Sequence, residues 1–149
     1  MNPQSKLKVL FLCTGNSCRS QMAEGWAQHL KGDEIEPYSA GISPHGVDRR
    51  AVVAMAEIGV DISSHTSDHV DELKDVDFDY VVTVCDHARE HCPVFPGKAA
   101  MVHKSFPDPP WLAREATSDE EALPHYRRVR DQIRDFVENM PGNLKNVRQ

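Results

Sequence analysis

The chain has 149 residues, of which 40% are hydrophobic and 27% are charged, values that are ordinary for a globular protein of one domain. Its formal net charge of -6 argues against nucleic acid or an anionic membrane as the main partner. No apolar run approaches the roughly 18 residues of a membrane span, and the segment before Leu7 lacks the apolar core of a signal peptide. These features predict a single cytoplasmic domain over residues 1–149, whose four cysteines serve catalysis or metal binding rather than structural disulfides.

The first third of the chain predicts a strand, a helix and a second strand. Residues 7–12 form an apolar run with β-branched and aromatic members, which is typical of a buried strand. Residues 35–40 favour another strand, which Gly41 and Pro44 end. Between the two strands, Gly32 stops a predicted helix. The apolar face of this helix consists of Met22, Ala23, Trp26, Ala27 and Leu30.

The middle of the chain predicts a second helix and the clearest strand. Asp48 is placed to cap a helix that ends before Gly59. The apolar face of that helix, which runs to about residue 58, consists of Ala51, Val52, Met55 and Ile58. A polar loop follows over residues 63–67, and residues 71–74 favour a short helix. Residues 78–84 carry the strongest strand signal, because the segment is rich in valine and aromatic residues.

The last third predicts a strand, a loop and a long helix. Residues 98–102 form a weaker strand, and residues 106–111, which include three prolines, form a loop. The polar tail over residues 141–149 is expected to fray. Strands and helices therefore alternate along the chain, and this alternation predicts an α/β fold with a mainly parallel sheet and right-handed crossovers.

The long helix carries two conflicting signals at its start. Ser118 and Glu121 match a capping box, which begins the helix at that point. Pro124 interrupts the pattern, so the helix either begins near Leu123 or continues through a kink. Its buried stripe is predicted to contain Tyr126, Val129, Ile133, Phe136 or Val137, and Met140.

The loop between the first strand and the first helix carries the strongest chemical signal. Residues 13–20, with the sequence CTGNSCRS, place a cysteine at the strand end and an arginine at the helix start. The backbone N–H groups of such a loop and the positive end of the helix favour a bound anion. The same charges stabilise a thiolate and lower a cysteine pKa from about 8.5 to roughly 4–7. We therefore predict an oxyanion site with Cys13 as the nucleophile.

Two side chains complete this predicted site. Arg19 can grip two oxygens of a tetrahedral anion through its planar guanidinium group, and Ser20 can hydrogen-bond the Cys13 sulfur. The oxyanion-binding residues are predicted to be Thr14, Gly15, Asn16, Ser17, Cys18 and Arg19. The alternative, in which Cys13 is only a small buried apolar residue, does not account for the C-x5-R-S spacing. A Walker-type nucleotide loop is excluded because the sequence lacks G-x4-G-K-[ST].

A second pair of cysteines follows the strand predicted at residues 78–84. Cys13 and Cys85 both follow strands of a parallel sheet, where ligands bind at the carboxyl ends, so we expect both to face one crevice. Cys92 lies seven residues after Cys85. In a regular helix this pair is too far apart for a disulfide, which needs Cα atoms within about 7 Å. Bridging the pair therefore requires the segment to unwind.

Two alternatives stay open for this segment. Cys85, His87, His91 and Cys92 are suitable zinc ligands, although their short spacing matches no common zinc motif. An inert structural role for both cysteines is the other alternative. We favour a redox role because it connects three cysteines in one chemical sequence.

Asp108 is the candidate acid of the site. A carboxylic acid on a loop above the oxyanion can protonate a leaving oxygen if burial keeps its pKa high. The alternative is that Asp108 only begins a proline-rich turn, which is a frequent role of Asp-Pro pairs. The residues alone leave these two interpretations open.

Together these residues resemble a known family, the low-molecular-weight protein tyrosine phosphatase fold, and within it the thioredoxin-coupled arsenate reductases. The resemblance covers nearly the whole chain, in the segments VLFLCTGNSCRSQMAEG, SAGI, GVDISSHTS, VVTVCDHAREHCP and FPDP. It implies a three-layer α/β fold with a four-stranded, mainly parallel sheet and helices on both faces. The pair of Cys85 and Cys92 is what separates the reductases from phosphatases with the same oxyanion site.

The resemblance implies a triple-cysteine relay in which Cys13 attacks arsenate while Asp108 protonates the departing hydroxyl. Cys85 then attacks Cys13 and expels arsenite, and Cys92 attacks Cys85 to form a disulfide that thioredoxin reduces. Cys18 has no part in this relay. Phosphate and sulfate are expected to compete with arsenate, and the protein is expected to act as a monomer without a required cofactor.

Some reductases of this branch also hold a potassium ion behind the loop. The matching oxygen-bearing residues here are Asn16, Glu24, Ser39, Thr66 and Asp68. The alternative is that these are ordinary loop and surface polar groups, and both interpretations stay open.

The sequence departs from the family beside Asp108. Phosphatases of this family carry tyrosines there, whereas this chain has Pro110 and Trp111, which weakens the alternative function of phosphate monoester hydrolysis. The electron donor is not fixed by the resemblance, because relatives on this fold use glutaredoxin and glutathione. A zinc-binding or redox-sensing module over residues 85–92 is the third hypothesis.

Overall fold

Four parallel strands form one sheet in the order β2-β1-β3-β4. The computed structural model describes residues 6–92 and 99–145 of the chain. The predicted α/β fold with a parallel sheet is confirmed. The strands are β1 (Leu7–Cys13), β2 (Ile35–Gly41), β3 (Tyr80–Thr83) and β4 (Ala100–His103).

The register of the sheet brings the carboxyl ends of its strands to one edge. Cys13, the last residue of β1, pairs with Gly41 at the end of β2. Thr83, at the end of β3, pairs with Leu12 on one side and His103 on the other. The residues that directly follow these strands are therefore neighbours in space, although they are far apart in the sequence.

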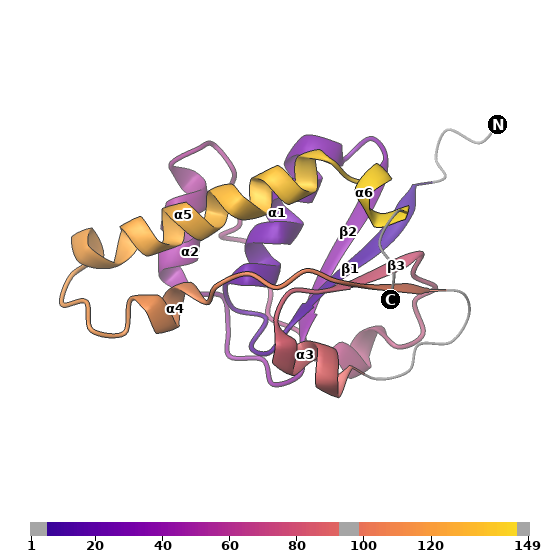
Figure 1. Cartoon of the computed structure of the whole chain (residues 1–149), viewed down its shortest axis with the longest axis horizontal. Helices are drawn as coiled ribbons and strands as arrows, with labels where there is room; N and C mark the ends of the chain where they lie inside the picture. Colours follow the sequence, from indigo (N-terminus) through magenta and orange to yellow (C-terminus); the bar gives the residue numbers. More distant parts are fainter. Residues whose placement is uncertain (1–5, 93–98, 146–149) are drawn as a thin grey trace.

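Helices cover the sheet on both faces. α1 (Arg19–Lys31), α2 (Arg49–Ala56) and α5 (Asp119–Glu138) pack against one another, as Figure 1 shows. The chain crosses from β1 to β2 in one direction and onward to β3 and β4 in the other. Right-handed connections then place α3 (Asp86–His91) on the face opposite α1, where it contacts β1 and β3. Because the direction reverses at β1, the carboxyl end of β1 is the expected ligand site.

The core follows from the apolar runs in the sequence. β1 is central, and its four residues from Val9 to Leu12 are each 0% exposed, because helices cover both of its faces. The predicted stripe of α5 is confirmed, with Val137 rather than Phe136 fully buried. Two apolar residues predicted on helix faces are wrong: Leu30 and Ile58 are each 36% exposed. Both lie at or beyond the last turn of their helix, where no other element covers them.

Two segments predicted without regular structure contain short helices. The loop predicted over residues 106–111 is wrong in its second half, because α4 (Pro109–Leu112) begins there. Prolines fit the first turn of a helix, where the missing N–H has no helical partner. The predicted fraying of the tail is wrong for α6 (Gly142–Lys145), which is held by the buried side chain of Leu144. Residues 146–149 lie outside the described residues.

Several predicted boundaries are shifted. α5 begins at Asp119, capped by Ser118 Oγ, which accepts a hydrogen bond from the Glu121 amide at 3.2 Å. The helix continues through Pro124, so the predicted start near Leu123 is wrong. The short helix predicted over residues 71–74 is a 3-10 helix, η1 (Val70–Leu73), shifted by one residue. Strands β3 and β4 are shorter than the predicted segments 78–84 and 98–102, of which residue 98 lies outside the described part.

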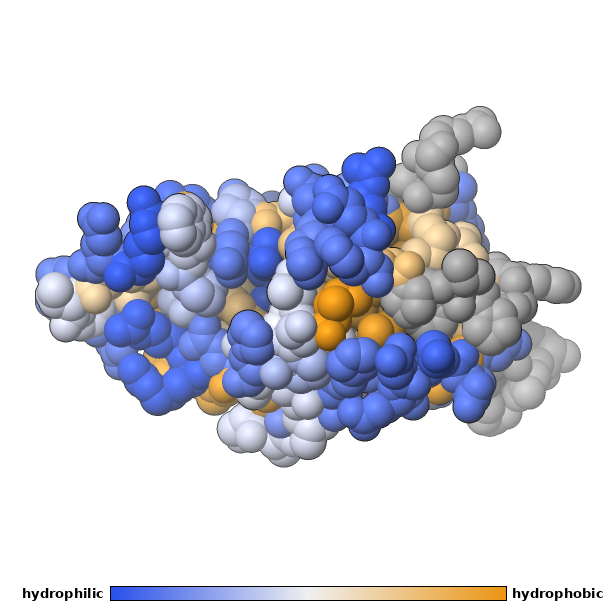
Figure 2. All heavy atoms as spheres, turned by 90° about the horizontal axis from the view of Figure 1, so that it is seen from below, coloured by the Kyte–Doolittle hydropathy of each residue, from blue (hydrophilic) through white to orange (hydrophobic). Residues whose placement is uncertain are grey.

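Turns and surface agree with the composition. Gly59 follows α2 with φ +83, which favours glycine, whereas Gly32 follows α1 with φ -58, so its freedom is not what ends that helix. The face drawn in Figure 2 is mostly hydrophilic, with apolar atoms gathered in small areas near its middle. Among the described residues, no helix is both long and apolar enough to cross a membrane.

Candidate active site

The predicted oxyanion loop lies between the last residue of β1 and the first residue of α1. Cys13 is 3% exposed, and Ser20, in the first turn of α1, is fully buried beside it. Their side chains are in contact, with 2.9 Å between Cys13 Sγ and Ser20 Oγ. Asn16 Nδ2 donates a hydrogen bond to the same Ser20 oxygen at 2.8 Å. Ser20 Oγ is therefore an acceptor toward Asn16, and its own hydrogen is available to the Cys13 sulfur.

Asn16 holds the bend of this loop. Its φ is 45, in the left-handed region that asparagine tolerates better than most residues. The Asn16 side-chain oxygen accepts from the Asp68 amide at 2.8 Å, and its carbonyl accepts from Gln21 Nε2 at 3.0 Å. Gly41 approaches from β2, where an added Cβ would lie 2.7 Å from the Asn16 nitrogen. Side-chain hydrogen bonds and one close glycine thus fix the loop before any anion binds.

Arg19 reaches over the pocket mouth from the start of α1. Its Nη1 donates to the Phe106 carbonyl at 3.0 Å, and its Nη2 lies 3.7 Å from Asp108 Oδ1. The guanidinium group is mostly buried, whereas 41% of the Asp108 side chain is exposed. The burial that an acid role for Asp108 requires is therefore partial here. Asp108 also precedes α4 as its N-terminal flanking residue, without a side-chain cap hydrogen bond.

These groups line one cavity of about 400 Å³ at the carboxyl end of β1. Its volume is ample for a tetrahedral oxyanion. Asp108 and Arg19 line this cavity together with residues of the loop, so the structure brings the predicted nucleophile, cation and acid together. The lining residues are Cys13, Thr14, Gly15, Ser17, Cys18, Arg19, His45, Asp48, Asp108 and Pro110.

Cys18 differs from Cys13 in its electrostatic surroundings. Burial raises the pKa of the Cys18 thiol well above its usual value, and the carboxylate of Asp48 raises it further. Asp48 is itself held by the hydroxyl of Tyr126, which donates to Asp48 Oδ2 at 2.7 Å. A thiol whose charged form is disfavoured is a poor nucleophile, because the thiolate is the reactive form. The absence of Cys18 from the relay stays a prediction, and Cys18 lines the pocket, where it was predicted to bind the oxyanion.

Cys85 reaches the edge of the loop, as expected for residues after neighbouring parallel strands. Its Sγ lies 3.3 Å from the hydroxyl oxygen of Thr14, the residue after Cys13. Cys85 also caps α3, because its Sγ accepts from the Ala88 amide at 3.4 Å. The side chain is 5% exposed. The second predicted cysteine thus contacts the residue that follows the first, from a different element.

Cys92 lies at the other end of α3. It follows the last helical residue, His91, and is half-buried. Burial raises the pKa of the Cys92 thiol to about 11. In this state Cys92 is separated from Cys85 by the whole of α3, and its thiolate is disfavoured. Pro93, the next residue, lies outside the described residues.

The zinc alternative for this segment finds no support in the geometry. His87 and His91 stack with their ring centroids 4.2 Å apart, but His91 Nδ1 contacts the His87 carbonyl at 2.9 Å. Cys85 is turned inward, toward Thr14. Within residues 6–92 and 99–145, no group of three or more His, Cys, Asp or Glu side chains is arranged to hold a metal ion.

Four of the five predicted potassium ligands form two hydrogen-bonded pairs, and the fifth, Asn16, belongs to the loop itself. Ser39 Oγ donates to Glu24 Oε1 at 2.5 Å, and Thr66 Oγ1 donates to Asp68 Oδ2 at 3.1 Å. Burial raises the pKa of the Glu24 carboxyl, and the charge of Asp68 raises it further, which places the two carboxylates near each other. Oxygen donors with two carboxylates fit a hard cation in chemical type. Asn16 joins them through its bond to the Asp68 amide.

Comparison with known proteins identifies the family. The low molecular weight phosphotyrosine protein phosphatase family matches residues 8–149. The chain belongs to this family. An arsenate reductase of Halalkalibacterium halodurans is 52% identical over 129 residues, which are 87% of this chain and 91% of that protein. An arsenate reductase of Bacillus subtilis is 50% identical over 125 residues, which are 84% of this chain and 88% of that protein.

A solved structure extends the comparison to the fold. It is described as an arsenate reductase in the phosphate binding state, and it superposes with a TM-score of 0.72 at 33% identity. The match covers 92% of this chain and 98% of that chain. The predicted membership of the phosphatase family and the predicted fold are therefore confirmed.

Relative to the pattern expected for phosphatases of this family, the pocket rim is altered. Pro110 lines the pocket where a tyrosine was expected. Trp111 is 61% exposed, does not line the pocket, and stacks under the Arg114 guanidinium group at 4.0 Å. The side chains that would hold an aromatic ester are thus replaced by a small ring and a tryptophan turned outward.

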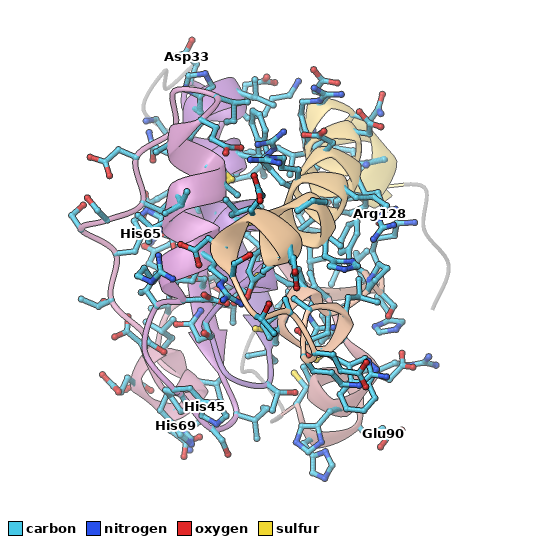
Figure 3. All side chains as sticks on the ribbon, turned by 90° about the vertical axis from the view of Figure 1, so that its left-hand side faces the viewer. Asp33, His45, His65, His69, Glu90 and Arg128 are labelled. Carbon is cyan, nitrogen blue, oxygen red and sulfur yellow. The ribbon has the colours of Figure 1, made fainter. Side chains whose placement is uncertain are left out.

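Three groups that line the pocket or contact its residues were not predicted as site residues from the sequence. His45 lies over the loop, because an added Cβ on Gly15 would come within 3.2 Å of its Nδ1, and Figure 3 places it at the surface. Asp48 was predicted only as a helix cap, yet it also lines the pocket. The Phe106 carbonyl anchors Arg19 through its backbone. Of the three, only Asp48 carried a sequence signal, and that signal pointed to capping.

Proposed function

We propose that this protein is an arsenate reductase that works by a three-cysteine relay and is re-reduced by thioredoxin. One observation carries the proposal: Cys85 Sγ contacts Thr14 at the edge of the pocket that holds Cys13. A phosphatase needs only the first thiol. A second thiol at the same edge, with a third at the far end of a short helix, supports electron transfer.

The first step uses the oxyanion site. Arsenate binds between the loop amides and the Arg19 guanidinium, and the Cys13 thiolate, which accepts a hydrogen bond from Ser20, attacks arsenic. Asp108, which lies beside the Arg19 guanidinium in the pocket lining, gives a proton to the departing hydroxyl, which leaves as water. The product is a covalent Cys13–arsenic(V) adduct.

The next steps move two electrons out of the sulfurs. The Cys85 thiolate attacks Cys13 Sγ, the electron pair of the sulfur–arsenic bond passes to arsenic, and arsenite leaves. Cys92 then attacks Cys85, so that Cys13 departs as a thiolate and a Cys85–Cys92 disulfide remains. A dithiol of thioredoxin reduces that disulfide by exchange. The balance is one arsenate reduced for one dithiol oxidised.

The relay sets the surroundings in which the protein works. Three thiols must be kept reduced between turnovers, which supports the cytoplasmic location proposed from the sequence. We also propose that the protein works as a monomer, as the resemblance to the reductases implies. Phosphate and sulfate carry the same tetrahedral arrangement of oxygens, so both are proposed to compete for the site.

The test is arsenate-dependent oxidation of NADPH in the presence of thioredoxin and thioredoxin reductase, followed by mass mapping of disulfides. We expect turnover with thioredoxin, little with glutaredoxin and glutathione, and a Cys85–Cys92 disulfide after one round. Turnover supported only by glutathione would contradict thioredoxin as the electron donor. Hydrolysis of an aryl phosphate that needs Cys13 but not Cys85, without any arsenate reduction, would establish the phosphatase alternative instead.

We also propose that potassium binds behind the loop at Asn16, Glu24, Ser39, Thr66 and Asp68. The two carboxylates supply the charge, and the hydroxyls of Ser39 and Thr66 contact them. The ion would stiffen the segments that hold the loop through the bond between Asp68 and Asn16. Its role is structural, and no reaction step depends on it.

A thermal unfolding series checks the ion. At equal ionic strength, replacing choline chloride by potassium chloride is expected to raise Tm by about 2–5 °C, as for a ligand that binds only the folded state. Glu24→Gln should lose this rise. Glu34→Gln, a change at an exposed position beyond the end of α1, should keep it. An identical rise in both variants would place any bound potassium elsewhere.

A further inference from the structure

We propose that His103 and Asp86 form a latch that holds α3 folded and so controls when Cys85 and Cys92 come together. The latch is defined as the side-chain pair of these two residues. The inference rests on the proposed relay, because it concerns the helix between the second and third cysteines. His103 and Asp86 contact neither arsenate nor the reacting sulfurs, so both are positioning residues.

The latch joins the edge of the sheet to the first residue of α3. His103 ends β4, and its Nε2 lies 2.9 Å from Asp86 Oδ1. A carboxylate only accepts, so Nε2 carries a hydrogen and donates it. The other ring nitrogen, Nδ1, lies 2.7 Å from the hydroxyl of Thr83, the partner of His103 across the sheet. Both nitrogens are thus engaged, and the ring is fixed in one orientation.

α3 is short and buries little surface of its own. The helix has only six residues, far fewer than the roughly 12–15 that an isolated helix needs, and Ala88 is its one buried residue. Its other anchor is the cap from Cys85 Sγ to the Ala88 amide at 3.4 Å. Sulfur is a weak acceptor, and this cap uses the atom that reacts in the relay. Joining Cys85 to Cys13 weakens this cap, whereas the latch still ties the first residue of α3 to β4.

The relay requires α3 to unwind at one step only, the attack of Cys92 on Cys85. Cys85 and Cys92 are seven positions apart on either side of α3, which in a helix corresponds to about 10 Å between their Cα atoms. A disulfide allows roughly 7 Å between Cα atoms. Burial also raises the pKa of the Cys92 thiol to about 11. Unwinding α3 brings Cys92 closer and exposes it, so the same motion that permits attack also makes its thiolate easier to form. A folded α3 therefore keeps Cys92 inactive.

Oxidation of the two thiols measures this motion without arsenate or thioredoxin. In a Cys13→Ser/Cys18→Ser chain, Cys85 and Cys92 are the only thiols left. The diazene oxidant diamide takes two electrons and two protons from them, becoming a hydrazine as the disulfide forms. Mass spectrometry of quenched samples gives the rate, which depends on how often α3 opens.

We expect Asp86→Asn and His103→Leu each to raise this rate by about three- to tenfold, the size of a typical net hydrogen bond in a protein. The double variant should not exceed the faster single variant, because both changes remove one contact. Glu90→Gln removes the same charge from an exposed position of α3, labelled in Figure 3, and should leave the rate unchanged. If His103→Leu fails to fold, His103→Ala takes its place in the single and double variants, because Asp86→Asn alone does not separate the latch from the helix dipole.

Each other outcome decides against the latch. Rates equal to or below that of the parent chain in Asp86→Asn and His103→Leu would overturn the latch and leave the relay standing. Rate increases that multiply in the double variant would show that Asp86 acts through the helix dipole alone. If no Cys85–Cys92 disulfide forms in any chain, the relay itself is overturned, and the latch with it.

Discussion

The Cys92→Ser variant is expected to release one arsenite per protein molecule and then stop. Its oxyanion site is intact, so Cys13 still forms the arsenic adduct and Cys85 still displaces arsenite. The third thiol is missing, so the Cys13–Cys85 disulfide has no internal nucleophile to open it. Multiple turnover should fall to background, while the first turnover keeps the rate of the natural protein.

A rapid-quench measurement of arsenite against protein concentration checks this burst. Mass mapping of the stopped protein should find Cys13 joined to Cys85, whose sulfur lies beside Thr14 at the pocket edge. Cys13→Ser is the matched control with no burst at all, because no adduct forms. Continuous turnover by Cys92→Ser would mean that thioredoxin opens the first disulfide directly, and that α3 has no part in the reaction.

The local part of the site could be predicted from the sequence. The contact between Cys13 and Ser20 spans a loop of known length between a strand and a helix, so chain geometry alone brings the two side chains together. The core strand β1 was also predicted from a short stretch, because a continuous apolar run is stable as a strand only where both of its faces are buried. These features depend on short stretches whose preferences agree with the fold.

The distant contacts could not be predicted in this way. Thr14 and Cys85 are 71 residues apart, and His103 and Asp86 are 17 apart, so their contacts depend on the register of separate strands. Parallel topology predicted that Cys13 and Cys85 face one crevice, but not which atoms meet. The pairing of His103 has no signal of its own, because a histidine at a strand end is compatible with many neighbours.

Helix ends show the same limit in the fold. α4 was missed because prolines were taken as breakers, although two of them stand in its first turn, where they are tolerated. Leu30 and Ile58 continue apolar patterns past the point at which other elements cover them. A periodic pattern indicates which face of a helix is buried, but the length of the covering element decides where burial ends.

The Arg19→Lys variant is expected to lose about 10²- to 10³-fold in the rate of the first turnover at low arsenate, as when a preorganised donor to a reacting oxyanion is removed. Arg19 uses one nitrogen to hold the Phe106 carbonyl and another to approach Asp108, and these contacts hold the guanidinium group in the pocket lining. A lysine ammonium is a single point charge, and it cannot hold that carbonyl and two oxygens of the anion together.

Single-turnover rates over a range of arsenate concentrations separate binding from chemistry. We expect both a weaker apparent affinity and a slower rate at saturation, because the guanidinium charge faces the oxygens in the ground state and in the transition state. Arg114→Lys is the matched control: Arg114 stacks on Trp111 outside the pocket, so the variant should keep the natural rate. Equal rates in the two variants would mean that the loop amides alone bind the anion. In that case phosphate should also compete equally well with arsenate in both, which inhibition measurements on the same samples would reveal.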